Sequence, residues 1–180
     1  YNSYYPANFD DMLDLEMMNL RQSSFTGCQF TSTNFSNCNL TKCDFGMLDS
    51  GIVQLNDGTV QRQFTPVVFG TSILTDVDVT GSSFHGAEMN MILSMRGIKG
   101  KIANIDIIEN DQHTGFKRAC PSSLPTNWIC KYGYFIGPGA NLEGQILEVR
   151  RDYGDPMPYT NLDLSNLYLS TSNFKNSDLH

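Results

Sequence analysis

Large apolar residues recur at every fifth position over long stretches of this chain. The first run separates them by Asn, Ser, Thr, Gln and a few charged residues, and consists of Leu15, Leu20, Phe25, Phe30, Phe35, Leu40 and Phe45. The residue two positions before each is mostly small, as at Ser23, Cys28, Thr33, Cys38 and Cys43. Neither a helix, with about 3.6 residues per turn, nor a strand, with a period of two, produces this spacing.

The pattern then returns in later blocks, and internal repeats of this kind determine the architecture. The later runs are Phe69, Leu74, Val79, Phe84 and Met89, then the single unit Ala140–Gly144, then Leu164, Leu169, Phe174 and Leu179. One further unit, Ala7-Asn8-Phe9-Asp10-Asp11, is shifted by one residue against the first run. The repeat blocks therefore span about 7–45, 67–91, 140–144 and 162–179, and we predict one solenoid domain over 1–180.

A period of five requires a chain that turns a corner every five residues, with two side chains of each unit inward and three outward. Four such sides make one coil of about twenty residues, and coils stack at the inter-strand spacing of about 4.8 Å. The large residue fills the axis and the small one lets the corner close. The predicted core is Leu20, Phe25, Phe30, Phe35, Leu40, Phe45, Leu74, Phe84, Leu164, Leu169, Phe174 and Leu179.

The repeat units resemble a known family. Ala-Asn-Phe-Asp-Asp, Thr-Asn-Phe-Ser-Asn, Cys-Asn-Leu-Thr-Lys and Ala-Asn-Leu-Glu-Gly are similar to the A(D/N)Lxx signature of pentapeptide-repeat proteins. The resemblance covers roughly half of the chain and implies an all-β fold, the right-handed quadrilateral β-helix. This chain departs from uninterrupted members, because its phase shifts between Phe45 and Phe69 and again before Leu142 and Leu164.

The first interruption, residues 46–66, predicts a hairpin insertion. Two alternating stretches, 52–55 and 60–64, flank Asn56-Asp57-Gly58-Thr59, and an Asp-Gly between such stretches is a strong hairpin signal. Insertions in solenoids often lie on a binding face. We therefore take Leu55 and Val60 as candidate partner contacts; the alternative is a surface decoration without a partner.

The second interruption, residues 92–139, predicts a longer loop insertion of different charge. It carries a net charge of +3, which leaves −10 for the rest of a chain whose formal net charge is −7. Such asymmetry marks either a contact surface for an acidic partner or a solvated loop. The candidate contacts are Arg96, Lys99, Lys101, Lys117 and Arg118.

The cysteines fall into two groups. Cys28, Cys38 and Cys43 occupy the small inward position, where a thiol packs as a compact apolar group. Cys120 and Cys130 lie outside the repeats and would close a small loop as a disulfide, which implies an oxidising setting such as a lumen or a virion surface. The alternative is two free cysteines in a reducing cytosol.

No catalytic constellation stands out, so we predict a protein that is not an enzyme and needs no cofactor. The histidines, His85, His113 and His180, have no metal-ligand spacing, and there is no Cys-x-x-Cys pair. Gly137-Pro138-Gly139 lacks the lysine of a phosphate loop. No apolar stretch approaches the length of a membrane-spanning helix.

Two functions remain. The first is a noncatalytic scaffold or adaptor that contacts proteins within a larger assembly, with end-to-end self-association through the C-terminal coil as a further prediction. The second comes from the resemblance, since some pentapeptide-repeat proteins are acidic rods that imitate DNA and bind gyrase. The charge distribution disfavours this mimicry, because the only charged residues within 19–45 are Arg21, Lys42 and Asp44. We also expect a chain that begins at Tyr1 without methionine to be processed or part of a longer protein.

Overall fold

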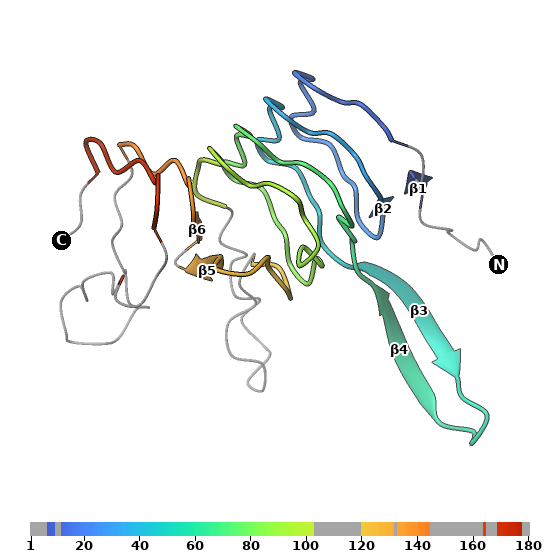
Figure 1. The fold of residues 1–180 in the computed structure, drawn as a ribbon. Helices are drawn as coiled ribbons and strands as arrows, with labels where there is room; N and C mark the ends of the chain where they lie inside the picture. Colours follow the sequence, from blue (N-terminus) through green and yellow to red (C-terminus); the bar gives the residue numbers. More distant parts are fainter. Residues whose placement is uncertain are drawn as a thin grey trace.

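The computed structural model describes residues 7–9, 12–102, 120–131, 133–144, 164 and 169–177. Within these ranges the chain forms stacked four-sided coils without helices (Figure 1). Parallel bridges join residues that are about one coil apart, so that Asp14 pairs with Asn34 and Asn19 pairs with Asn39. The four sides run through Asp14, Asn34, Ile73 and Ser94; Asn19, Asn39, Asp78, Lys99, Asn141 and Asn173; Ser24, Asp44 and Ser83; and Gln29, Val68, Glu88 and Ser123.

Each corner is a hydrogen-bonded turn that the repeat sequence supports locally. At one corner the amide of Cys38 donates to the carbonyl of Phe35 at 3.0 Å. Asn37, the third residue of this turn, has φ of +60°, a value that Asn and Gly tolerate better than most residues. The side-chain oxygen of Asn34 accepts the amide of Ser36 at 3.0 Å. The Asn or Asp before the large residue therefore stabilises the corner that follows it.

The core is a set of side-chain columns along the axis. The rings of Phe25, Phe45 and Phe84 stack with centroids 5.1 and 5.0 Å apart and nearly parallel planes. Of the predicted core, Phe30, Phe35, Leu40, Phe45, Leu74 and Phe84 are at most 1% exposed. Leu20 and Phe25 in the first coil, and Leu164, Leu169 and Phe174 near the other end, are only partly buried. Leu179 lies outside the described residues.

The small inward residues also hydrogen-bond to the preceding coil. The thiol of Cys38 donates to the carbonyl of Leu15 at 2.9 Å, and the Ser72 hydroxyl donates to the carbonyl of Phe30 at 2.7 Å. The Ser72 oxygen in turn accepts the amide of Thr33 at 3.2 Å. A small residue with a donor therefore does more than let the corner close, because it adds a hydrogen bond to the backbone of the preceding coil.

Residues 92–102, which we expected to begin the second insertion, instead continue the coils. Ser94 bridges to Ile73 and Lys99 to Asp78, while Met95 is buried. One extra residue at the preceding corner leaves Leu93 exposed and shifts the phase of the repeat. The apolar period is then hidden, because Gly100 takes the place of the large residue in the next unit. A Cβ at Gly100 would lie 2.8 Å from the backbone nitrogen of Thr80.

The described residues also contain three two-stranded sheets. β1 (Asn8–Phe9) pairs in parallel with β2 (Gln29–Phe30), and β5 (Ile129–Lys131) pairs antiparallel with β6 (Tyr134–Ile136). β3 (Leu48–Gln54) and β4 (Val60–Thr65) form an antiparallel hairpin that leaves the stack between Phe45 and Val67 and projects away from the coils (Figure 1).

Candidate partner-binding surface

The tip of the β3–β4 hairpin is an ordered turn. The amide of Gly58 donates to the carbonyl of Leu55 at 2.9 Å, and the amide of Leu55 donates to the carbonyl of Thr59 at 2.8 Å. Gly58 has φ of +83°, as expected for the glycine that closes a three-residue hairpin loop. Hydrogen bonds from the Thr59 hydroxyl and amide lower the pKa of Asp57. The exposed tip is thus held by its own side chains.

One face of the hairpin is apolar around a single ion pair. The register places Phe64 opposite Asp49, Arg62 opposite Ile52 and Val60 opposite Gln54. Ile52, Val60 and Phe64 are 73%, 66% and 49% exposed. Arg62 Nη2 lies 2.7 Å from Asp49 Oδ2, while the Gly51 amide, more than Arg62, lowers the pKa of that carboxyl. These residues form what we call the apolar hairpin face: Asp49, Ile52, Gln54, Val60, Arg62 and Phe64.

The sequence-based candidates cover this face only in part. Val60 lies on it, and Leu55, 44% exposed, lies at the tip. Ile52 and Phe64 were missed, although both are large apolar residues in a segment predicted to be a hairpin. The alternation of Val60, Arg62 and Phe64 with Gln61 and Gln63 is a period of two that would have identified the face.

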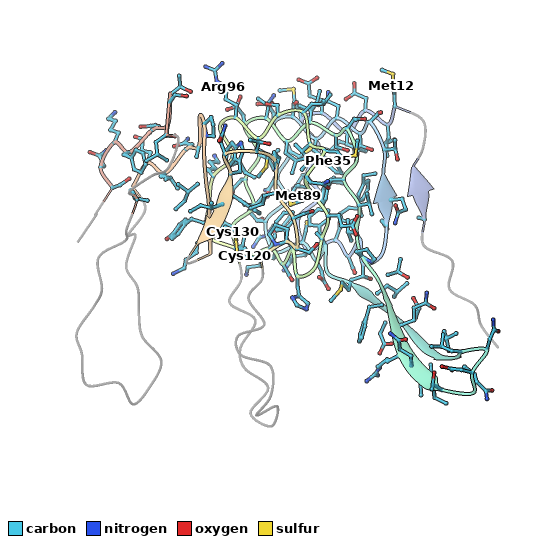
Figure 2. The ribbon with its side chains drawn as sticks, turned by 60° about the horizontal axis from the view of Figure 1, so that its bottom comes forward. Met12, Phe35, Met89, Arg96, Cys120 and Cys130 are labelled. Carbon is cyan, nitrogen blue, oxygen red and sulfur yellow. A yellow bond between two sulfur atoms is a disulfide. The ribbon has the colours of Figure 1, made fainter. Side chains whose placement is uncertain are left out.

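The basic candidates lie elsewhere, on the outer sides of the coils. Lys99 Nζ is 4.0 Å from Asp78 Oδ2, and Lys101 Nζ lies 5.5 Å from the centre of the Tyr134 ring. Burial raises the pKa of Tyr134. Arg96 follows the side that begins at Asp14, and Figure 2 shows it on the opposite side of the stack from the hairpin. The structure therefore does not bring these cations and the apolar hairpin face together.

Lys117 and Arg118, the other two basic candidates, lie outside the described residues.

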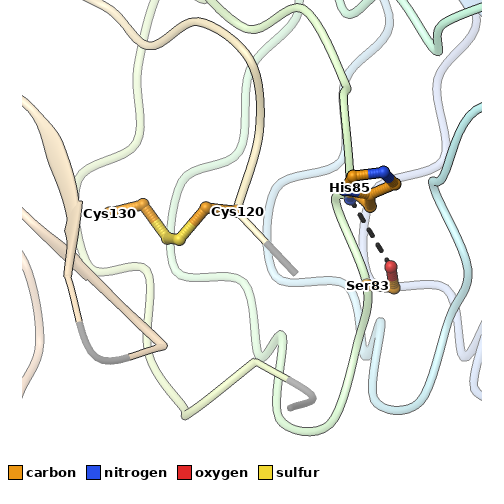
Figure 3. Close-up of a disulfide and its surroundings, with 4 residues drawn as sticks. All are labelled: Ser83, His85, Cys120 and Cys130. Atoms are coloured by element: carbon orange, nitrogen blue, oxygen red, sulfur yellow. Dashed lines mark hydrogen bonds between the residues drawn. A yellow bond between two sulfur atoms is a disulfide. The ribbon is translucent and has the colours of Figure 1, made fainter. Parts of the chain in front are cut away.

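Cys120 and Cys130 are joined in a disulfide (Figure 3). Both are partly buried and pack against the main hydrophobic cluster. The bond ties the chain just before Ser123, which bridges to Glu88, to strand β5. It therefore connects the coil side at Ser123 to the β5–β6 pair. In the same view the amide of His85 donates to the Ser83 hydroxyl at 3.5 Å.

The cysteines of the first run are free thiols. Cys38 and Cys43 are buried and Cys28 is partly buried. Desolvation by the surrounding core raises the pKa of all three thiols. A thiolate is the nucleophilic form of cysteine, so their burial makes these thiols poor nucleophiles at neutral pH.

The described residues do not bring together three or more His, Cys, Asp or Glu side chains that could bind a metal. His85 is the single histidine among them; His113 and His180 lie outside. In this part of the chain we find no helix that is both long and apolar enough to span a membrane.

Comparison with known proteins identifies the repeats. Residues 14–46 match the family model of pentapeptide repeats, in eight copies. This confirms the predicted all-β, right-handed quadrilateral β-helix. No curated protein matches the chain.

The solved structures that match the chain include the following two. One is HetL, a pentapeptide repeat protein involved in heterocyst differentiation regulation from the cyanobacterium Nostoc sp., with 18% identity and a TM-score of 0.44 over 97% of this chain. Another is QnrB1, a plasmid-mediated fluoroquinolone resistance protein, with 13% identity and a TM-score of 0.21 over 92%. The chain spans 58% and 57% of the lengths of those two proteins.

Proposed function

We propose that this chain, whose residues 14–46 match the family model of pentapeptide repeats, is a noncatalytic structural or adaptor subunit. Its solenoid serves as a rigid frame that mediates protein–protein contacts within a larger assembly. The hairpin is the principal contact element of this frame. A fold of this kind does not by itself specify a function, so the proposal depends on the exposed surface.

The observation that carries the proposal is the apolar hairpin face. Ile52, Val60 and Phe64 are largely exposed on a two-stranded sheet that projects from the coils (Figure 1). A two-stranded hairpin is marginally stable in water by itself. Apolar side chains gathered on one exposed face are typical of an interaction surface. A partner that covers this face would bury all three side chains and stabilise the hairpin.

The charges of the coils favour this function over the alternative, an acidic DNA mimic that binds gyrase or topoisomerase. Residues 19–45, which form coil sides, carry only three charged side chains, and these are of mixed sign: Arg21, Lys42 and Asp44. Duplex DNA carries one negative charge per about 1.7 Å of its axis. Mixed charges of this kind do not imitate that density.

A replacement of the hairpin tests the proposal. In the third coil, the corner that corresponds to the base of the hairpin is turned by two residues, His85 and Gly86, between Phe84 and Ala87. Replacing residues 46–66 by His-Gly should therefore close the second coil in the same way. The expected result is a folded chain that no longer enters the native assembly from which the wild-type protein is isolated.

The mass of the particle that carries each chain, measured under native conditions, distinguishes the two outcomes. The wild-type chain should migrate with a particle much larger than its own 20.1 kDa. A chain without the hairpin that still enters this particle would refute the assignment of the hairpin. A free wild-type dimer would instead support end-to-end association and call for a gyrase inhibition assay.

A further inference from the structure

Strand β4 has a free edge, and the hairpin register decides which of its backbone groups are exposed there. The sheet contains only β3 and β4 among the described residues. Leu55 and Thr59 form a hydrogen-bonded pair at the tip. Because hydrogen-bonded and non-bonded pairs alternate in an antiparallel ladder, Gln61 and Gln63 direct their backbone groups toward β3. The backbone groups of Val60, Arg62 and Phe64 therefore point away from the sheet.

The outer edge of β3 is less suited to pairing. Its register shifts between Asp49 and Gly51, and Gly51 has φ of +88°. A bulge of this kind bends a strand and interrupts its row of donors and acceptors, which protects sheet edges from pairing. β4 has no bulge, glycine or proline between Val60 and Thr65. The regular edge of the hairpin is therefore that of β4.

The same three residues also determine the side-chain chemistry at this edge. Val60 and Phe64 place exposed apolar groups on either side of Arg62 on the apolar hairpin face. The Arg62 side chain is 67% exposed and has one short contact, from Nη2 to Asp49. A guanidinium has five N–H donors, so it can receive a second carboxylate without losing the first.

We propose that β4 binds an extended segment of a partner protein as a third, antiparallel strand. Residues of this segment opposite Val60 and Phe64 are apolar, and the residue opposite Arg62 is a carboxylate. The inference rests on the proposed function of the hairpin and specifies the partner chemistry. A second copy fits less well, because two β4 edges in full overlap would place Arg62 opposite its own equivalent, and like charges opposite each other destabilise a sheet.

The test uses a synthetic peptide, acetyl-Ser-Val-Thr-Glu-Thr-Val-Ser-amide, and the full isotope-labelled chain. NMR hydrogen exchange should show that the amides of Val60, Arg62 and Phe64 exchange faster than those of Gln61 and Gln63. Added peptide should protect the first three amides. Methylating the backbone nitrogens of the two Val and the Glu of the peptide removes three hydrogen bonds, so binding should weaken by about a hundredfold. The matched peptide, methylated at the two Thr and the second Ser, should bind as the parent does.

Charge reversal tests the side-chain component. The wild-type chain should bind the parent peptide, which has Glu at its centre, more tightly than a peptide with Lys in place of this Glu. Arg62→Glu should reverse this preference. Gln61→Glu, on the other face of the hairpin, should leave it unchanged. Equal binding of both methylated peptides, or no binding of the parent peptide, would overturn the proposal. Concentration-dependent protection of the same amides without peptide would identify a second copy as the occupant and also overturn it. If the peptide fails but hairpin replacement still releases the chain from its assembly, the proposed function stands without this edge.

Discussion

Phe45 lies at the centre of the aromatic core, and its replacement by alanine measures how stability is distributed along the stack. Its ring lies 5.1 Å from that of Phe25, 5.2 Å from that of Phe69 and 5.0 Å from that of Phe84, and the side chain is fully buried. Removing a buried Phe side chain lowers the free energy of unfolding by about 3–5 kcal/mol. Domains of this size are stable by only about 5–15 kcal/mol.

Phe25 occupies the same column one coil earlier and gives the internal comparison. It contacts Phe30 and Phe45 but is only partly buried, because the first coil has a neighbour mainly on one side. Phe25→Ala should therefore cost about half as much, about 1.5–2.5 kcal/mol. Phe64→Ala on the exposed hairpin should change the free energy of unfolding by less than about 0.5 kcal/mol.

Urea unfolding followed by the fluorescence of Trp128 measures all three variants. The midpoint should fall most for Phe45→Ala, less for Phe25→Ala and hardly at all for Phe64→Ala. The thermal midpoint of Phe45→Ala should fall by about 10 °C. Equal losses for Phe45→Ala and Phe25→Ala would show that the first coil is covered as completely as the second, which would refute the reasoning from the partial exposure of Phe25.

Three further predictions concern the polar and sulfur groups of the core. Ser72→Ala should lower the free energy of unfolding by about 1–3 kcal/mol in the same urea assay, since it removes the hydroxyl that donates to the Phe30 carbonyl and accepts the buried amide of Thr33; a neutral result would show that other groups replace these two hydrogen bonds. Because burial raises the pKa of Cys38 and Cys43 above the ordinary 9.0, their contribution to stability is complete below pH 9 and is lost as pH rises above it. The alkaline loss should be smaller in a variant with serine at both positions, and an identical pH profile would contradict this. Reducing the Cys120–Cys130 disulfide, whose cysteines are 10 residues apart, should cost about 2–3 kcal/mol, measured by urea unfolding with and without reductant; unchanged stability would show that the loop is held by its packing alone.

The coils were predictable from residues 15–45 because each repeat contains the residues that form its own corner. The large residue at every fifth position, the small one before it and the Asn or Asp between them act within one corner or between adjacent coils. The turn-forming residues and the buried apolar residues therefore favour the same four-sided coil, and the period of five alone identifies the architecture.

The end of the second repeat block was not predictable in the same way. Leu93 is large and apolar but exposed, whereas Gly100, which is in register with Val79 of the preceding coil, has no side chain. Both residues contradict the apolar period, although the bridges of Ser94 and Lys99 continue the coils without a break. Hydrogen bonding between coils holds the chain in register where the side-chain pattern fails.

The candidate site was predictable as a segment but not as a surface. The Asp57-Gly58 turn indicated the hairpin, and the period of two in β4 puts Phe64 on the face of Val60, but Ile52 joins this face only through the register of β3 with β4. The bulge at Gly51 brings Asp49 opposite Phe64. By contrast, Arg96, Lys99 and Lys101 suggested a basic loop in the sequence, and the structure distributes them over the outside of the coils.

The amino-acid sequence by itself determined the solenoid, the hairpin at residues 46–66 and the inward position of the first three cysteines, because these depend on interactions within a few residues or at a constant period. Only the tertiary structure decided where the coils resume after Met89, that Cys120 meets Cys130, and which side chains the hairpin exposes together. The resumed coils depend on bridges between segments about twenty residues apart, whereas the disulfide and the hairpin face depend on geometry, namely the approach of two cysteines 10 residues apart and the register of β3 with β4. A pattern of residue types does not specify either kind of contact.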